Sequence, residues 1–112
     1  MSIRGIGLAS VGWALVLCVH SVTPAVAEEG DRDLGEQIAS RECAGCHGVA
    51  GAKGVTIQGV FVPSFSEIAR RPNQSRQRLE AFITIPRHPM PGLPLQPREL
   101  KHLAEYIYSL RH

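Results

Sequence analysis

The stretch Cys43-Ala44-Gly45-Cys46-His47 is the most informative part of this 112-residue chain. Its C-x-x-C-H pattern is the one that attaches a c-type haem. Two thiols one helical turn apart can add to the two vinyl groups of one porphyrin, and the histidine that follows can ligate the iron. We therefore predict that Cys43 and Cys46 hold one covalent haem c through thioether bonds and that His47 is the proximal axial ligand of its iron.

A bare pair of cysteines at this spacing also occurs in redox-active and zinc-binding proteins. A thioredoxin-like redox site lies within a βαβ pattern, which this sequence does not show. A structural zinc site needs four ligands, usually from two such pairs, and the chain has no second pair. A chance cluster with a simple disulfide between Cys43 and Cys46 is the remaining alternative. The rest of the sequence favours haem over all three.

The N-terminal segment has the pattern of an export signal. Arg4 provides a positive charge, residues 6–19 are an almost unbroken apolar run, and residues 25–27 (Ala-Val-Ala) form a typical cleavage site. The run is shorter than the roughly 20 residues that cross a bilayer as a helix. We predict a signal peptide over residues 1–27, with an uncleaved anchor as the alternative, and one domain over residues 28–112. Because c-type haem is attached outside the cytoplasm, we expect a bacterial periplasmic protein.

The predicted domain is small and lacks the usual means of stabilising a small domain. Of the three cysteines, only Cys43 and Cys46 lie in it, so none remains for a structural disulfide. Chains this short rarely bury enough apolar surface to fold stably without a disulfide, a metal or a similar cross-link. The whole sequence has only three Phe, two Tyr and one Trp. A covalently held haem would supply the missing centre of the core.

The predicted domain favours helices, which makes the expected fold class all-α. We expect helices over residues 33–43, 64–70, 75–84 and 97–110. Two of them begin with a capping box, Asp33 with Glu36 and Ser64 with Glu67. Glycines break residues 48–59 into an irregular loop, and no stretch shows convincing strand alternation.

Apolar residues at helical spacing define the inward face of each expected helix. The positions expected to be buried are Leu34, Ile38, Leu79, Phe82, Ile83, Leu100, Leu103, Ile107 and Leu110. In the last helix, which Pro97 opens at its first position, Tyr106 falls at the edge of this face. His102 lies on its polar side and His112 at the terminus, so we expect both at the surface.

Met90, the one methionine of the predicted domain, is the predicted distal axial ligand. The sixth ligand in electron-carrying cytochromes is typically a methionine sulfur, which raises the potential. Residues 86–94 contain four prolines, and proline fixes φ and lacks an N–H, so this segment is a stiff extended loop. A pre-ordered loop loses less entropy when it holds a weak ligand. His88 is the rival ligand, and an apolar filling role for Met90 is the other alternative.

From Asp33 to Leu110 the chain resembles a class I cytochrome c of the small periplasmic kind. The matching features are Gly35, the Cys43–His47 motif, Pro63, Met90 with its prolines, and the last helix with Leu103, Tyr106 and Ile107. The resemblance implies the cytochrome c fold. In that fold the N- and C-terminal helices cross, and short helices and loops wrap around one covalent haem.

Two roles transfer by resemblance, because their positions match. Gly35 would let the first helix cross close to Leu103 and Tyr106, and glycine offers no Cβ to keep two helices apart. The Pro63 carbonyl would bind the second ring nitrogen of His47, a contact that orients the ligand and tunes its basicity.

Two positions depart from the family pattern. The usual Gly-Pro-x-Leu reads Val62-Pro63-Ser64-Phe65. Ile38 and Ala39 stand in the region where the first helix usually carries an aromatic residue. The first departure bears on the alignment of Pro63, and the second bears on details of the helix crossing rather than on the fold.

The implied function is one-electron transfer by a carrier that is not an enzyme. With both axial positions filled, no substrate needs to reach the iron, and the sequence resembles no catalytic triad or phosphate loop. Two alternatives stay open. One is a haem subunit of a specific dehydrogenase or oxidase complex, and the other is a gas-binding or peroxidatic haem protein with a labile sixth ligand.

The expected partners are redox proteins, namely a periplasmic dehydrogenase, a membrane oxidase or a cytochrome complex. The formal net charge is +2, and the middle of the chain gathers the arginines 70, 71, 76, 78 and 87. This concentration of positive charge favours docking on an acidic patch of a partner protein. The alternative is that these arginines form an ordinary solvated surface. Export argues against nucleic acid as a partner. We expect a monomer that meets the membrane only through a partner or an uncleaved anchor.

Overall fold

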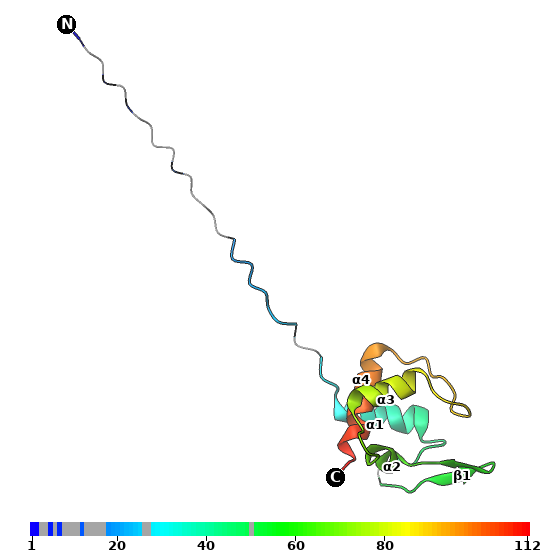
Figure 1. The fold of residues 1–112 in the computed structure, drawn as a ribbon. Coiled ribbons are helices and arrows are strands. Elements are labelled where there is room, and N and C mark those ends of the chain that lie inside the picture. Colours follow the sequence, from blue (N-terminus) through cyan, green and yellow to red (C-terminus); the bar gives the residue numbers. More distant parts are fainter. Residues whose placement is uncertain (3–4, 6, 8–11, 13–17, 26–27, 50) are drawn as a thin grey trace.

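The computed structural model describes residues 1–2, 5, 7, 12, 18–25, 28–49 and 51–112 (Figure 1). About half of the predicted signal peptide over residues 1–27 lies outside these described residues, and it stays a prediction. In the described parts of the chain, no helix is long and apolar enough to cross a membrane.

Helices dominate the described domain, and a short hairpin interrupts them. In chain order the elements are α1 (Arg32–Ile38), the π-helix η1 (Ala39–Cys43), β1 (Val55–Ile57), β2 (Val60–Val62), α2 (Phe65–Ala69), α3 (Arg76–Thr84) and α4 (Pro97–Ser109). Figure 1 shows α1, α3 and α4 gathered together, with the hairpin extending to one side. A helix is therefore present in each of the four predicted regions.

The first helix begins earlier than predicted. Asp31, and not Asp33, is the N-cap, because its side chain accepts a hydrogen bond from the Leu34 N–H at 2.9 Å. The Asp33 carboxylate instead accepts a hydrogen bond from Arg32. The helix widens into η1 and ends at Cys43, as predicted.

The close crossing of α1 and α4 organises the helices. Gly35 lies at the crossing, where an added Cβ would sit 1.9 Å from the His102 carbonyl oxygen and 2.7 Å from the Tyr106 Cβ. The buried stripe of α1 therefore runs through Gly35 and Ile38. Leu34 lies beside this stripe and is 44% exposed, so its predicted burial is wrong.

The loop predicted to be irregular contains an antiparallel hairpin, so the all-α prediction misses one feature. Val55 pairs with Val62 and Ile57 with Val60. Gln58 and Gly59 have φ angles of 48° and 80°. Two successive positive φ angles are typical of the tight turn whose twist matches that of paired strands. The β-branched residues on both sides were the available signal, but Thr56 is the one polar residue in the two strands, so no alternation extends across them.

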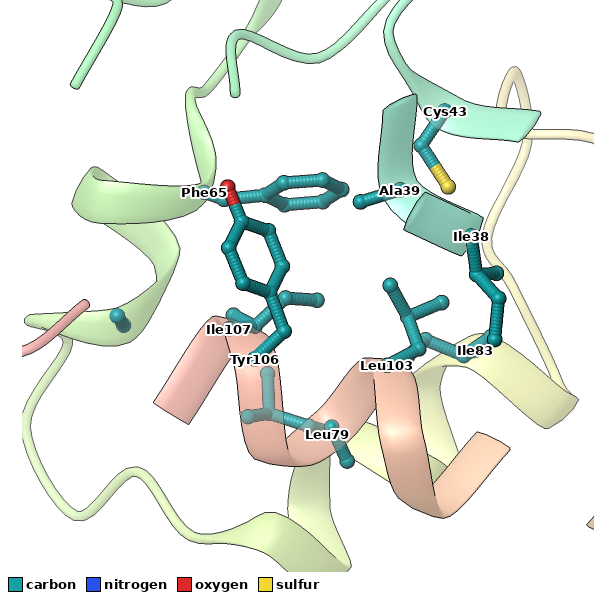
Figure 2. Close-up of a cluster of buried hydrophobic side chains, with 11 residues drawn as sticks. Ile38, Ala39, Cys43, Phe65, Leu79, Ile83, Leu103, Tyr106 and Ile107 are labelled. Carbon is teal, nitrogen blue, oxygen red and sulfur yellow. The ribbon is translucent and has the colours of Figure 1, made fainter. Parts of the chain in front are cut away.

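Side chains from α1, η1, α2, α3 and α4 converge on one apolar core (Figure 2). Its members are Ile38, Ala39, Cys43, Phe65, Ala69, Leu79, Ile83, Leu103, Ala104, Tyr106 and Ile107. Leu100 and Leu110, which were predicted to be buried, are only partly buried against it. Tyr106 was expected at the edge of the α4 face, yet it is fully buried because the α1 crossing covers it.

Two further predictions about burial are wrong. Phe82 is 43% exposed, because Leu79 and Ile83 form the face of α3 that meets the core. The Arg87 guanidinium lies over the Phe82 ring, 5.7 Å from its centroid. His102 is buried rather than at the surface, because α1 packs over that side of α4.

Candidate functional site

The C-x-x-C-H motif forms the end of η1 and the turn that follows it. The backbone N–H groups of Cys46 and His47 both donate to the Cys43 carbonyl, at 3.1 and 2.9 Å. The two cysteines therefore lie one turn apart. Cys43 is buried, with its sulfur turned toward the core in Figure 2, whereas Cys46 is exposed.

The Cys43 thiol does not have the character of a disulfide-exchange site. Both cysteines are free. Burial raises the pKa of the Cys43 thiol to about 11, with the nearby Glu42 charge contributing in the same direction. Redox-active cysteines have the opposite property, a lowered thiol pKa. Within the described residues, no group of three or more His, Cys, Asp or Glu side chains could hold a metal ion.

His47 is held by the segment that leads into α2. Its Nδ1 lies 2.8 Å from the Pro63 carbonyl oxygen. A carbonyl can only accept, so Nδ1 carries the hydrogen and donates it. This tautomer leaves Nε2 as the ring nitrogen with a lone pair for a metal. The Pro63 carbonyl thus makes the contact that the resemblance implied, while its role beside an iron ligand stays a prediction.

Phe65 is a site residue that the sequence did not reveal. Its ring stacks on the His47 imidazole, with centroids 5.2 Å apart and planes at 11°. It also meets Tyr106 edge to face, at 6.2 Å and 89°. The Phe65 N–H donates to the Gly48 carbonyl at 2.9 Å, which joins α2 to the residue after the motif. An aromatic after Pro63-Ser64 was visible in the sequence, but nothing there indicated its partner.

Met90 lies on a separate loop between α3 and α4. Its N–H donates to the Arg87 carbonyl at 3.0 Å, and the intervening His88–Pro89 peptide bond is cis. Met90 is half-buried and His88 is exposed. Farther along the loop, Leu93 and Leu95 pack against the core. The structure therefore brings the two cysteines, His47 and Pro63 together, and it holds Met90 on a different, anchored segment.

Sequence comparison agrees with this geometry. A family model described as "Cytochrome C oxidase, cbb3-type, subunit III" matches residues 30–107. The chain belongs to this family of c-type cytochrome domains. It is 41% identical over 100 residues to the "Cytochrome c-552" of Bradyrhizobium diazoefficiens, an alignment that covers 89% of this chain and 93% of the relative.

A more distant relative is of the same kind. The "Cytochrome c-553-like" protein of Synechocystis sp. is 29% identical over 89 residues, which is 80% of this chain and 78% of the relative. No solved structure matches the chain. Membership of this family makes the protein a c-type cytochrome electron carrier with covalent haem c and iron as its cofactor.

The donor set of the described site fits that cofactor. Cys43 places one sulfur against the apolar core, Cys46 provides a second sulfur one turn later, and His47 follows directly. The hydrogen bond to Pro63 fixes the imidazole so that Nε2 is the nitrogen available to iron. Apart from Met1, the sequence has one methionine, Met90.

Proposed function

We propose that this cytochrome is a one-electron carrier of the bacterial periplasm, with Cys43 and Cys46 as the thioether residues and His47 and Met90 as the axial ligands. When bound, the haem supplies an iron that takes up and releases one electron. The contact that carries the proposal is the 2.8 Å hydrogen bond between His47 Nδ1 and the Pro63 carbonyl. It orients the imidazole before any metal is present, and it increases the ligand's basicity.

The protein's own part is to keep the ligand geometry the same in both oxidation states. Phe65 stacks on one face of His47 and is itself packed against Tyr106. Because the imidazole is already held in place, little reorganisation accompanies a change of charge at the iron. The apolar core around Cys43 excludes water from this side of the site.

Several features support Met90 as the second ligand. It is half-buried, whereas the rival His88 is exposed. The Met90 loop carries four prolines over residues 86–94 and is tied to the core through Leu93 and Leu95. A stiff loop reduces the entropy lost when a weak thioether ligand is held.

The proposal includes export and removal of residues 1–27, which leaves residues 28–112 as the mature protein. Its partners are redox proteins, and electrons pass between a periplasmic or membrane donor and acceptor. The family description names an oxidase subunit, which favours a second candidate, a haem subunit of an oxidase complex. Against that candidate, the chain covers 93% of a relative named simply as a cytochrome c.

Optical spectroscopy of the oxidised holoprotein tests the ligand assignment. An iron–thioether bond gives a weak long-wavelength charge-transfer band. We expect this band in the wild type and in His88→Ala, and we expect Met90→Ala to lose it and to have a lower reduction potential. A wild type without the band, or a Met90→Ala variant that keeps it, would contradict Met90 as the ligand.

Two further measurements test the remaining parts of the proposal. The intact mass of the exported protein should equal residues 28–112 plus one haem, and a mass that includes residues 1–27 would show an uncleaved anchor. Fractionation of the native host under mild conditions should yield a free periplasmic protein. Stable co-purification with an oxidase would favour the subunit candidate instead.

A further inference from the structure

The Glu67 carboxylate connects the segment before the hairpin to the residue that follows Pro63. Its Oε2 accepts the Ser64 N–H at 2.7 Å and the Gly54 N–H at 3.1 Å. Ser64 directly follows Pro63, whose carbonyl binds His47. Gly54 directly precedes β1, so one carboxylate oxygen joins the base of the hairpin to the start of α2.

The Ser64–Glu67 pair also forms the capping box of α2. The Ser64 hydroxyl accepts the Glu67 N–H at 3.2 Å, while the Glu67 carboxylate accepts the Ser64 N–H. A helix as short as α2 has little propensity to form alone, so its start depends on such contacts. The Ser64 N–H is the main cause of the lowered pKa of Glu67, with the Gly54 N–H contributing. The side chain is therefore an anionic acceptor at neutral pH.

The space around Gly54 is shaped to this arrangement. A Cβ added at Gly54 would lie 2.7 Å from the Glu67 Oε2, 2.8 Å from the Val62 carbonyl oxygen and 2.6 Å from the Phe61 Cζ. Only glycine allows the chain to come this close to the carboxylate. The residue at the base of the hairpin and the acid on α2 are thus matched to each other.

We propose that Glu67 is a positioning residue for the proximal ligand: by holding Ser64 and Gly54, it fixes the Pro63 carbonyl that accepts the hydrogen bond from His47. The inference rests on the proposed function, because it matters only if His47 ligates the iron. A well-fixed carbonyl acceptor strengthens the hydrogen bond that His47 Nδ1–H donates. The imidazole then gives more electron density to the iron, which favours the ferric state. Loosening the acceptor therefore raises the reduction potential.

Three substitutions of Glu67 separate positioning from charge. Glu67→Gln removes the charge but keeps an acceptor that suits a capping box. Glu67→Asp keeps the charge on a side chain too short to reach both N–H groups. Glu67→Ala removes both. If Glu67 acts by positioning, the Gln variant should match the wild type in the measured properties of His47, and the Asp and Ala variants should both differ from it. If Glu67 acts through its charge, the Asp variant should match the wild type, and the Gln and Ala variants should both differ.

The readouts are the solvent-exchange rate of the His47 Nδ1 hydrogen, measured by NMR on the reduced holoprotein, and the reduction potential. In the Glu67→Asp and Glu67→Ala variants we expect the Nδ1 hydrogen to exchange about tenfold faster, which is the factor for the loss of one ordinary hydrogen bond. We also expect the reduction potential of these two variants to rise. Gly54→Ala, which displaces the same carboxylate from the other side, should act alike. If Glu67→Ala does not fold, the Asp and Gln variants still give the decisive comparison.

The outcomes distinguish this inference from the proposed function. If the wild type lacks the NMR signature of a haem-ligated His47, then the proposed function fails, whatever the variants do. If that signature is present but Asp and Ala keep the wild-type exchange rate and potential, then the positioning role of Glu67 is overturned. A change shared by Gln and Ala but not by Asp would also overturn it, in favour of charge alone.

Discussion

His102 on α4 accepts a hydrogen bond from the backbone N–H of Asp31, the residue that caps α1. The Asp31 nitrogen lies 2.8 Å from the His102 Nδ1, and the Asp31 carboxylate in turn accepts the Leu34 N–H. Because an N–H can only donate, Nδ1 is the unprotonated ring nitrogen of His102. One imidazole thus ties the start of the first helix to the middle of the last.

Removing this acceptor should destabilise the helix crossing. We expect His102→Phe to lower the free energy of unfolding of the holoprotein by about 1–3 kcal/mol, because it leaves the Asp31 N–H without its acceptor. Denaturation by guanidinium chloride measures the change. His102→Asn, which retains an acceptor, should lose less. Equal losses in the two variants would mean that His102 contributes packing and not the hydrogen bond.

Gly35 should tolerate no side chain. In Gly35→Ala the added Cβ would meet the His102 carbonyl at 1.9 Å, and backbone cannot move aside as a flexible side chain can. We expect a loss of about 3 kcal/mol or more, at the upper end for overpacking, seen as a lowered Tm or a failure to accumulate holoprotein. Gln37→Ala, at an exposed position of the same helix, is the control. A Gly35→Ala variant as stable as this control would contradict the close crossing.

The ion pair between Arg76 and Glu105 should give stability that depends on pH. The Arg76 Nη2 donates to Glu105 Oε1 at 2.9 Å, and its Nε donates to Oε2. These hydrogen bonds lower the pKa of Glu105 from its ordinary value of 4.5. A lowered folded-state pKa contributes stability above the unfolded value, and that contribution is lost as pH falls through the folded pKa.

A double-mutant cycle of Arg76→Gln and Glu105→Gln isolates this contribution. The coupling should be favourable at pH 7 and should shrink toward zero as the pH falls below about 4. Urea denaturation at several pH values measures it. A coupling that stays constant from neutral to acidic pH would show that the pair does not act through its charge.

We expect Phe65 to stabilise the protein through its packing against His47 and not through the formation of helix α2. Phe65→Ala removes a fully packed ring between His47 and Tyr106, and we expect it to cost about 3–5 kcal/mol. Phe65→Leu keeps most of the apolar volume and should cost less than about 2 kcal/mol. Thermal unfolding of the two holoproteins checks the order. If both variants are equally unstable, ring stacking rather than volume is what the site requires.

Local signals predicted the helices well. The Ser64–Glu67 capping box and Pro97 at the first position of α4 both appear as expected. Each of these signals acts within one helical turn, so it can be read from neighbouring residues. The N-cap of the first helix was misplaced by two residues because Asp31 and Asp33 are similar capping residues, and the contact of Asp31 with His102 distinguishes them.

Burial was predicted less well wherever a partner from elsewhere in the chain decides it. Leu34 and Phe82 fit an apolar helix face by spacing, yet the α1–α4 crossing and the packing of α3 turn them outward. His102 looked like a surface residue, and α1 covers it. Helical periodicity gives the direction of each residue around its own axis, but it does not give the direction from which another helix approaches.

At the site, the chemical groups and their local spacing follow from the amino-acid order alone, because five consecutive residues place two sulfurs and an imidazole on one turn. The contact with the Pro63 carbonyl was expected only from the resemblance, and the folded chain makes it. The Phe65 ring stacked on that imidazole and the Glu67 carboxylate bridging Ser64 and Gly54 appear only in the tertiary structure. These contacts join segments separated along the chain, and their distances depend on how the loop, the hairpin and α2 pack together. Neighbouring residues are enough to predict which groups lie close together within one turn, whereas the orientation of a ligand depends on contacts between segments that are distant in the sequence.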